Sequence, residues 1–172
     1  MDSLSRIKNR NIAKLTTILP MLGTKLAEAV AVIEKDDVPW TAVSKPLSES
    51  RLAVVTTAGV HHKEQVPFDM KDAEGDPTFR ALDLSKPLNE FMITHDYYDH
   101  RDADKDINIV FPIQRLRELQ EEGVVGDLAR FHYGFMGHIL GRHIQYLVTQ
   151  SAPEVARRLK QDAVDAVLLT PG

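Results

Sequence analysis

Two short, almost uninterrupted runs of apolar and β-branched residues restrict the folds that this chain can adopt. They are residues 52–57 (LAVVTT) and residues 165–170 (DAVLLT). Runs of this length without polar alternation are typical of strands that are covered on both faces. Because helical patterns lie between them, the order of strand, helix and strand predicts a parallel sheet with helical crossovers. We therefore expect an α/β fold built on a Rossmann-like parallel sheet.

The clearest helical pattern between the two strands starts after Pro112, which suits the first turn of a helix because its missing N–H is not needed there. Apolar residues then share one face, and Gly123 suits the left-handed end of a helix. Further helices are predicted over residues 139–150 and from Ser151, which would be the N-cap, with Pro153 in the first turn. The weaker patterns are a loop over residues 63–77 and short strands over residues 79–84 and 91–94.

The N-terminal part of the chain carries an amphipathic helical stripe with a proline inside it. Pro20 interrupts the stripe, because proline removes a helix hydrogen bond and clashes with the preceding turn. We expect two helices or one kinked helix, over about residues 4–19 and 21–35, in a helical arm that covers residues 1–37. A proline-punctuated linker follows, and residues 38–172 are expected to form the α/β domain. The apolar residues of the stripe are Leu15, Leu19, Leu22, Leu26, Ala29 and Ile33.

Charge and composition exclude several classes of protein. The 172 residues are enough for one domain with its own core. The 21 basic and 25 acidic residues give a net charge of −4, and the basic residues are spread along the chain, so nucleic acid is not an expected partner. No apolar run reaches the roughly 18 residues of a membrane span and no signal peptide is recognisable, so we expect a cytoplasmic protein without a membrane partner. The absence of cysteine excludes a disulfide framework, a zinc–thiolate site and a cysteine nucleophile within these residues.

The segment that follows the first strand offers a candidate ligand site. In open α/β sheets, ligands gather beyond the carboxyl ends of the strands. Residues 56–62 (TTAGVHH) come at such an end, so Thr57, Gly59 and His61 are candidates for lining a cleft that holds a carboxylate or another anion. Thr170, at the end of the last strand, joins this set. The segment lacks the glycine motifs that bind phosphate or dinucleotides, and an ordinary turn with a hydrogen-bonded histidine is the alternative.

Residues 95–106 concentrate two histidines and five aspartates, and they provide the second group of candidates. If the segment is helical, Asp96 and His100 share a face, and if it is extended, His95 and Asp99 lie on the same side. Either pair suits a divalent cation, or a general base with its orienting carboxylate. A solvated, self-capped loop is the alternative. We expect His95, Asp96 and Asp99 to line the cleft and to bind no metal.

Residues 131–138 (FHYGFMGH) mix aromatic residues, histidines and glycines. The pattern favours aromatic side chains packed under a loop, with His132 or His138 hydrogen-bonded to the backbone. No serine lies in a Gly-x-Ser-x-Gly turn, so a hydrolase triad has no support.

Seven motifs follow one another in a characteristic order. They are VPWT (38–41), PLSESR (46–51), TTAGVH (56–61), GDPTFR (75–80), THDYYD (94–99), DKDINIVFP (104–112) and DAVLLTPG (165–172). In these motifs the chain resembles the selenoprotein B subunit of glycine, sarcosine and betaine reductases and of the related D-proline reductases. The resemblance covers most of residues 38–172, whereas the helical arm adds little to it.

The resemblance implies a selenocysteine, or a cysteine in some members, shortly after the strand at residues 165–170. Its selenolate attacks the α-carbon of an amine substrate that a pyruvoyl group on another subunit holds as a Schiff base. This chain has no cysteine and its sequence stops at Gly172, so we expect it to be the front part of a longer protein. The expected nucleophile lies after Gly172, behind a UGA codon, and the chain alone should be inactive and carry no cofactor. The implied partners are a small amine or amino-acid substrate and the other subunits of the reductase complex.

Two other functions remain open from the residues. A domain of this kind can bind a small ligand or a protein at the same cleft without covalent chemistry. A metal-dependent racemase or lyase would instead use the His/Asp segment. Because apolar surface is expected on the uncovered part of the sheet and on the stripe of the arm, we also predict a homo-oligomer.

Overall fold

The computed structural model describes residues 4–19, 21 and 41–172. Helix α1 spans Leu4–Ile18 and confirms the first predicted helix of the arm. The second predicted helix, apart from residue 21, and the start of the linker lie outside the described residues. No described helix has the length and apolarity that a membrane span requires.

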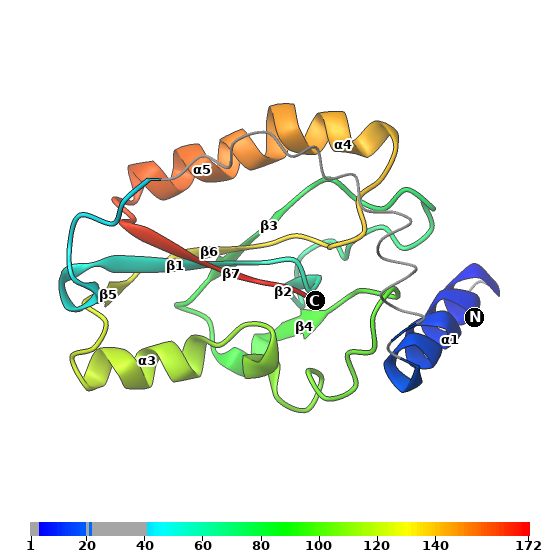
Figure 1. Ribbon diagram of the computed structural model, residues 1–172, viewed down its shortest axis with the longest axis horizontal. Helices are drawn as coiled ribbons and strands as arrows, with labels where there is room; N and C mark the ends of the chain where they lie inside the picture. The colour runs from blue at the N-terminus through cyan, green and yellow to red at the C-terminus, as the bar shows by residue number, and fades with distance from the viewer. Residues whose placement is uncertain (1–3, 20, 22–40) are drawn as a thin grey trace.

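Strand β1 (Arg51–Thr56) is the central strand of a five-stranded sheet (Figure 1). The other strands are β3 (Arg80–Asp83), β5 (Asp127–Leu128), β6 (Phe131–Gly134) and β7 (Ala166–Thr170). Strand β7 pairs in parallel along most of β1, whereas β5 and β6 pair in parallel with shorter parts of it. Strand β3 is antiparallel to β6. The α/β class and the strands at both apolar runs are confirmed, with a mixed, mostly parallel sheet. The prediction that the second run is a buried strand was wrong, because β7 pairs only with β1 among the described strands and its side chains Val167, Leu168 and Leu169 are exposed.

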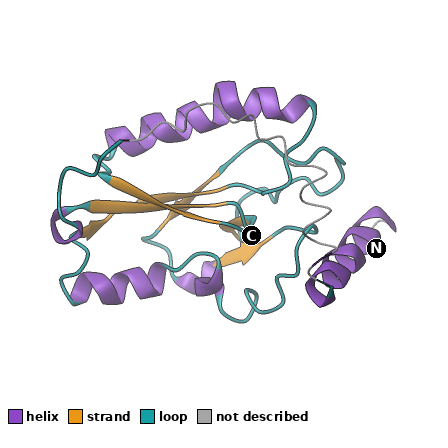
Figure 2. Ribbon diagram, viewed as in Figure 1, coloured by secondary structure: helices purple, strands orange, loops and turns teal. Residues whose placement is uncertain are grey.

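Helices lie on both sides of this sheet (Figure 2). Helix α3 (Ile113–Glu121) lies on one side, and α4 (Arg142–Tyr146) and α5 (Ala152–Gln161) lie on the other. Side chains alternate along β1, so Leu52 packs in the same cluster as residues of α3, while Ala53 packs with residues of α5. Since both faces of β1 are covered, its sequence shows no polar alternation.

A small second sheet pairs β2 (Val60–His62) with β4 (Phe91–Ile93) in antiparallel orientation. Strands β3 and β4 confirm the two weak strand patterns. The alternative of an ordinary turn over residues 56–62 was wrong for its last three residues, because they form β2, which begins directly after Gly59. Three short 3₁₀ helices complete the described elements, at Leu47–Glu49, Leu88–Glu90 and Ile107–Ile109.

The loop expected over residues 131–138 is partly a strand. Strand β6 lies between β1 and β3, and three of its four residues are buried. Its glycine has a steric reason, because a Cβ on Gly134 would lie 2.1 Å from the carbonyl oxygen of Val60. The glycine that resembled a loop signal therefore allows β2 to pass close to the end of β6. His132 and His138 do bind backbone carbonyls, those of Ala129 and Ala73, as predicted.

The two helices predicted around residue 151 form one continuous helical run. A π-helical segment (Leu147–Ser151) joins α4 to α5. Ser151 has helical backbone angles (φ −68°, ψ −48°) and makes no side-chain cap, so the predicted N-cap was wrong. Pro153 lacks the N–H that would bond to the carbonyl of residue 149, and a local π-helical register is a common way to accommodate such a gap.

The predicted end of α3 is confirmed. Gly123 follows the helix with φ +74°, in the left-handed region. Its N–H donates to the carbonyl of Gln120, as in other helix ends of this kind.

Candidate functional site

The carboxyl ends of β1 and β7 are held together by a shared hydrogen-bond acceptor. The hydroxyls of Thr56 and Thr170 both donate to the carbonyl oxygen of Val110, over 3.0 and 2.7 Å. The backbone N–H of Thr57 donates to the carbonyl of Thr170 over 3.0 Å. The two predicted residues Thr57 and Thr170 therefore lie side by side at the strand ends, as the sequence indicated.

Gly59 connects this edge to the second sheet. Its N–H donates to the carbonyl of Phe135 over 2.8 Å, and its carbonyl accepts from the N–H of Thr94 over 3.0 Å. Its φ is +74°, and a Cβ here would lie 2.5 Å from the carbonyl oxygen of Thr94 and 3.0 Å from Cβ of His95. Glycine is thus required for two reasons, and the close approach brings His95 to the end of β1.

His95 is buried, and its ring lies between two backbone amides. The amide nitrogen of Tyr97 lies 3.1 Å from Nδ1, and the amide nitrogen of Gly137 lies 3.2 Å from Nε2. A neutral ring accepts a hydrogen bond at one of these two nitrogens, whereas a protonated ring would accept at neither and would turn an N–H toward both amides, so the geometry favours the neutral form. Burial, together with the nearby charges of His100 and His138, lowers the pKa of His95 to about 4. His95 is therefore neutral at physiological pH.

Asp96 is 1% exposed and binds two arginines of α1. Arg6 donates to Oδ2 over 2.6 Å, and Arg10 donates to Oδ1 over 2.9 Å. Burial opposes the ionisation of Asp96, but the hydrogen bonds from the two arginines outweigh it and keep the pKa of Asp96 below its usual value. Asp96 therefore fastens α1 to the loop that carries His95, and it does not face an open cleft.

Asp99 has a local partner. The guanidinium of Arg101 binds both of its carboxylate oxygens, and this hydrogen bonding lowers the pKa of Asp99 to about 2. His100 pairs with Asp104 over 2.9 Å. Residues 96–105 form bends and turns, so neither of the two side-chain pairings considered for a helix or a strand is found among the described contacts.

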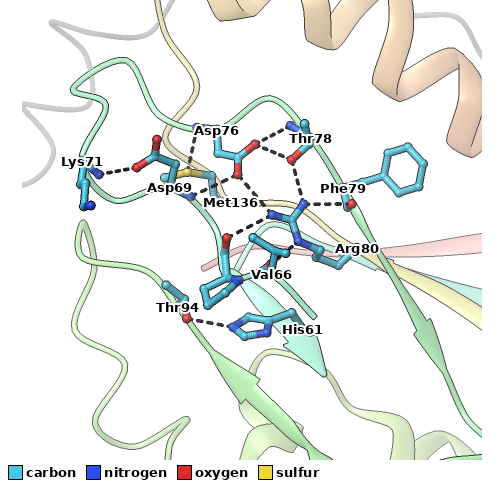
Figure 3. A network of polar contacts seen from close by, with 11 residues as sticks. His61, Val66, Asp69, Lys71, Asp76, Thr78, Phe79, Arg80, Thr94 and Met136 are labelled. Carbon is cyan, nitrogen blue, oxygen red and sulfur yellow. Dashed lines mark hydrogen bonds and ion pairs between the residues drawn. The ribbon is translucent and has the colours of Figure 1, made fainter. Parts of the chain in front are cut away.

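His61 lies in β2 and is fully buried. Its Nε2 lies 2.8 Å from the hydroxyl of Thr94, and its Nδ1 lies 2.8 Å from the carbonyl of His62. Burial is the main cause of its lowered pKa. The ring lies beside the polar network of the loop before β3 (Figure 3). Because His61 is fully buried, it lines no open surface. His61 is therefore a hydrogen-bonded histidine inside the core, which was the alternative to a residue that lines a ligand cleft.

The network in Figure 3 fixes the loop before β3. Asp76 accepts from the backbone of Thr78 over 2.9 Å and from Arg80 over 3.3 Å. Arg80 also donates to the carbonyl of Val66 over 2.7 Å, and its guanidinium lies 4.4 Å from the ring centre of Phe68. These contacts are internal to the loop, so we interpret the GDPTFR motif as structural.

Three side chains of metal-binding type lie close together at one place in the described part of the chain. They are Asp72, Glu74 and His143. Arg142 forms ion pairs with both carboxylates, and His143 binds Asp72 over 3.0 Å. Both carboxylates of the group are thus already paired with Arg142, and the group includes no residue of the His/Asp segment at 95–106.

Two residues that were not predicted from the sequence, Tyr98 and Gly172, lie close to His95. We call the place where these three residues meet the corner. The ring of Tyr98 lies 4.8 Å from the ring of His95, and its hydroxyl donates to the carbonyl of Ala58 over 3.1 Å. Burial raises the pKa of Tyr98. Gly172 packs here: a Cβ on it would lie 2.6 Å from Cα of Ala58 and 3.1 Å from Cε1 of Tyr98. The segment after β7 therefore runs directly to the corner of His95 and Tyr98.

We expect Asp96→Asn to loosen α1. The substitution keeps the volume but removes the charge that Arg6 and Arg10 share, and losing one side of a buried ion pair is strongly destabilising. Amide hydrogen exchange in α1 should become roughly tenfold faster or more, with β1 unchanged. Asp83→Asn is the control, because the side chain of Asp83 accepts hydrogen bonds from Arg130 and no described contact joins it to α1. Equal exchange rates in α1 for both variants would contradict the fastening role of Asp96.

The sequence of this chain matches a known protein family and several of its members. The family model for glycine/sarcosine/betaine reductase selenoprotein B matches residues 9–172. D-proline reductase subunit gamma of Acetoanaerobium sticklandii is 42% identical over 133 residues, which cover 77% of this chain and 53% of that protein. Glycine reductase complex component B subunit gamma of Symbiobacterium thermophilum is 33% identical over 137 residues (78% of this chain, 31% of that protein).

A betaine reductase complex component B subunit beta of Peptoclostridium acidaminophilum is 26% identical over 155 residues, which cover 86% of this chain and 34% of that protein. The chain therefore spans about half the length of the first relative and about a third of the other two. No solved structure matches the chain.

Proposed function

Because this chain belongs to the glycine/sarcosine/betaine reductase selenoprotein B family, we propose that it is the front part of a subunit that reductively cleaves a C–N bond in a small amino acid or amine. D-proline is the substrate that we propose first. The identity of 42% to a D-proline reductase subunit, against 33% and 26% to the glycine and betaine relatives, supports this choice.

The observation that carries the proposal is the position of Gly172. It packs against Ala58 and Tyr98, next to His95. We propose that the residue that follows Gly172 in the full protein lies at this corner. In the proposed full protein that residue is a selenocysteine or a cysteine, which supplies the nucleophile that displaces the amine from the α-carbon. A pyruvoyl group on another subunit is the proposed holder of the substrate amine.

The side chains around the corner fit an anionic nucleophile. His95 is neutral, and the phenol of Tyr98 stays protonated because burial raises its pKa. The nearby carboxylates form ion pairs: Asp96 pairs with Arg6 and Arg10, and Asp99 pairs with Arg101. An anion at this corner therefore meets no unpaired carboxylate among these groups, which limits electrostatic repulsion.

We propose distinct roles for the remaining candidates. Thr57 and Thr170 fix the strand ends, and Gly59 lets the loop of His95 approach them. Asp96 positions the loop through α1, and Asp99 lines its outer side. A cytoplasmic location and a homo-oligomeric state are further parts of the proposal. The metal-enzyme alternative has less support, because the acidic group at residues 72 and 74 is already paired with Arg142.

The test compares the chain ending at Gly172 with a longer chain that carries cysteine directly after Gly172 and the downstream region. Each is combined with the pyruvoyl-bearing subunit, a dithiol reductant and one of D-proline, glycine, sarcosine or betaine. Each reductive cleavage oxidises one dithiol to a disulfide, so substrate-dependent loss of thiol measures the rate with all four substrates. Reductive opening of D-proline also turns its secondary amine into a primary amine, which an amine-selective fluorescent reagent detects.

We expect activity with the longer chain only, and with D-proline above the other three substrates. In the longer chain, His95→Ala should lower the rate by roughly a hundredfold, as expected for a side chain that orders the reacting corner. His143→Gln, a histidine outside this corner, is the control. Inactivity of the longer chain with all four substrates would contradict the proposal and favour a binding domain.

A further inference from the structure

Helix α1 is attached to the domain by its polar face. Besides the two arginines on Asp96, Asn9 hydrogen-bonds with Tyr97, and Ala13 is 3% exposed. At 100° per residue, Arg6, Arg10 and Ala13 fall within an arc of roughly 60° on the helix circumference. This arc is the side that faces the loop of His95.

The apolar face of α1 points the other way. Its side chains are between 39% (Ile12) and 88% (Leu4) exposed, and they cover an arc of about 140° that is nearly opposite to the docked arc. The amphipathic helices of soluble domains normally turn this face inward. The side chains that form this outward face are Leu4, Ile7, Ile12, Leu15 and Ile18. An exposed contiguous apolar face of this kind is typical of an interaction surface.

The charges of α1 indicate what kind of surface covers this face. Every charged residue between Leu4 and Ile18 is basic. Arg6 and Arg10 bind Asp96, and Lys14 lies on the flank beside Arg10, where its charge acts on Asp99. Lys8 is exposed and lies within the apolar arc. A second copy of α1 would bring lysines against lysines. A protein groove with an apolar floor and an acidic rim complements both features.

We propose that the outward face of α1 binds such a groove on the pyruvoyl-bearing subunit of the same reductase complex. This inference rests on the proposed function, and it adds the surface through which the subunits join. The names of the relatives describe subunits or components of reductase complexes, which favours a protein partner over a lipid surface. Since α1 is bound to Asp96, next to His95, the partner would be brought beside the reacting corner.

The experiment measures binding separately from catalysis. The longer chain is titrated with the isolated pyruvoyl-bearing subunit, and the dissociation constant is measured by biolayer interferometry. The double variant Ile7→Asp, Leu15→Asp should bind at least tenfold more weakly, and Lys8→Glu should also bind more weakly and with a smaller dependence on salt. Val148→Asp is the control, because Val148 is 62% exposed on a different helical segment.

Circular dichroism shows whether each variant keeps its fold, and the substituted side chains are exposed in the domain. Equal affinity of the α1 variants and the wild type overturns the inference, as does a wild-type chain that does not bind the subunit. Two other results also overturn it: a wild-type dimer that the α1 variants abolish, or binding to phosphatidylglycerol vesicles that depends on the same residues while subunit binding does not. A longer chain that binds through α1 but has no reductase activity would count against the proposed function alone.

Discussion

Replacing Gly59 with alanine should destabilise the protein by roughly 3 to 5 kcal/mol, because the substitution combines backbone strain with a steric clash. The residue has φ +74°, which costs about 1–2 kcal/mol for a residue with a Cβ. The new Cβ would also lie 2.5 Å from the carbonyl oxygen of Thr94, so the start of the loop that carries His95 must move. Urea unfolding followed by circular dichroism measures the loss of stability.

Gly123 offers a matched control for this prediction. Its φ is also +74°, but a Cβ added to it would meet nothing within 4 Å. Gly123→Ala therefore reports the backbone strain alone, and the difference between the two variants reports the clash with Thr94. Equal losses of stability in the two variants would show that the approach of Gly59 to Thr94 is not tight.

Acidification should destabilise the fold well above the pH at which carboxylates become protonated. Burial is the main cause that lowers the pKa values of His95 and His132 to about 4 each, whereas an unfolded histidine titrates near 6.5. Between these values the unfolded chain binds more protons, so the free energy of unfolding falls as pH falls. Each buried histidine contributes a loss of about 3 kcal/mol between pH 6.5 and pH 4.

Urea unfolding at several pH values, together with NMR titration of the histidine ring protons, checks this prediction. His132→Gln should reduce the slope of the free energy of unfolding against pH, since it removes one of the buried rings whose pKa is lowered; His61 and His62, whose pKa values burial also lowers, keep part of the slope. The ring of His132 accepts from the N–H of Val54 over 2.7 Å, so the variant will also be less stable at neutral pH. A free energy of unfolding that is constant between pH 6.5 and 4.5 would refute the assignment.

The sequence predicted most of the sheet because its strongest signals are local. The runs at β1 and β7 and the stripe of α3 depend on residues within one element, and each was found. Strand β6 was missed because Gly134 serves a contact with Val60, a residue more than 70 positions away. A glycine that is needed for a long-range approach has the same appearance in the sequence as a glycine in a loop.

The candidate site was predicted in part for the same reason. Strand ends are visible in the sequence, so Thr57, Gly59 and Thr170 were placed together at one edge. The role of Asp96 was not visible, since its partners Arg6 and Arg10 lie about 90 residues earlier in the chain. Tyr98 and Gly172 are likewise distant in the sequence and close only in the folded protein. The aromatic and aspartate residues of the THDYYD motif were the only feature of the sequence that pointed to this part of the site.

The carbonyl of Val110 has a consequence for the energetics of binding. A carbonyl oxygen has two lone pairs, and the hydroxyls of Thr56 and Thr170 occupy both of them. The ends of β1 and β7 are therefore preorganised before any ligand arrives. When a molecule binds beside Gly172, the strand ends lose little backbone entropy because they are already ordered. More of the contact energy therefore contributes to affinity or to the correct orientation of the bound molecule.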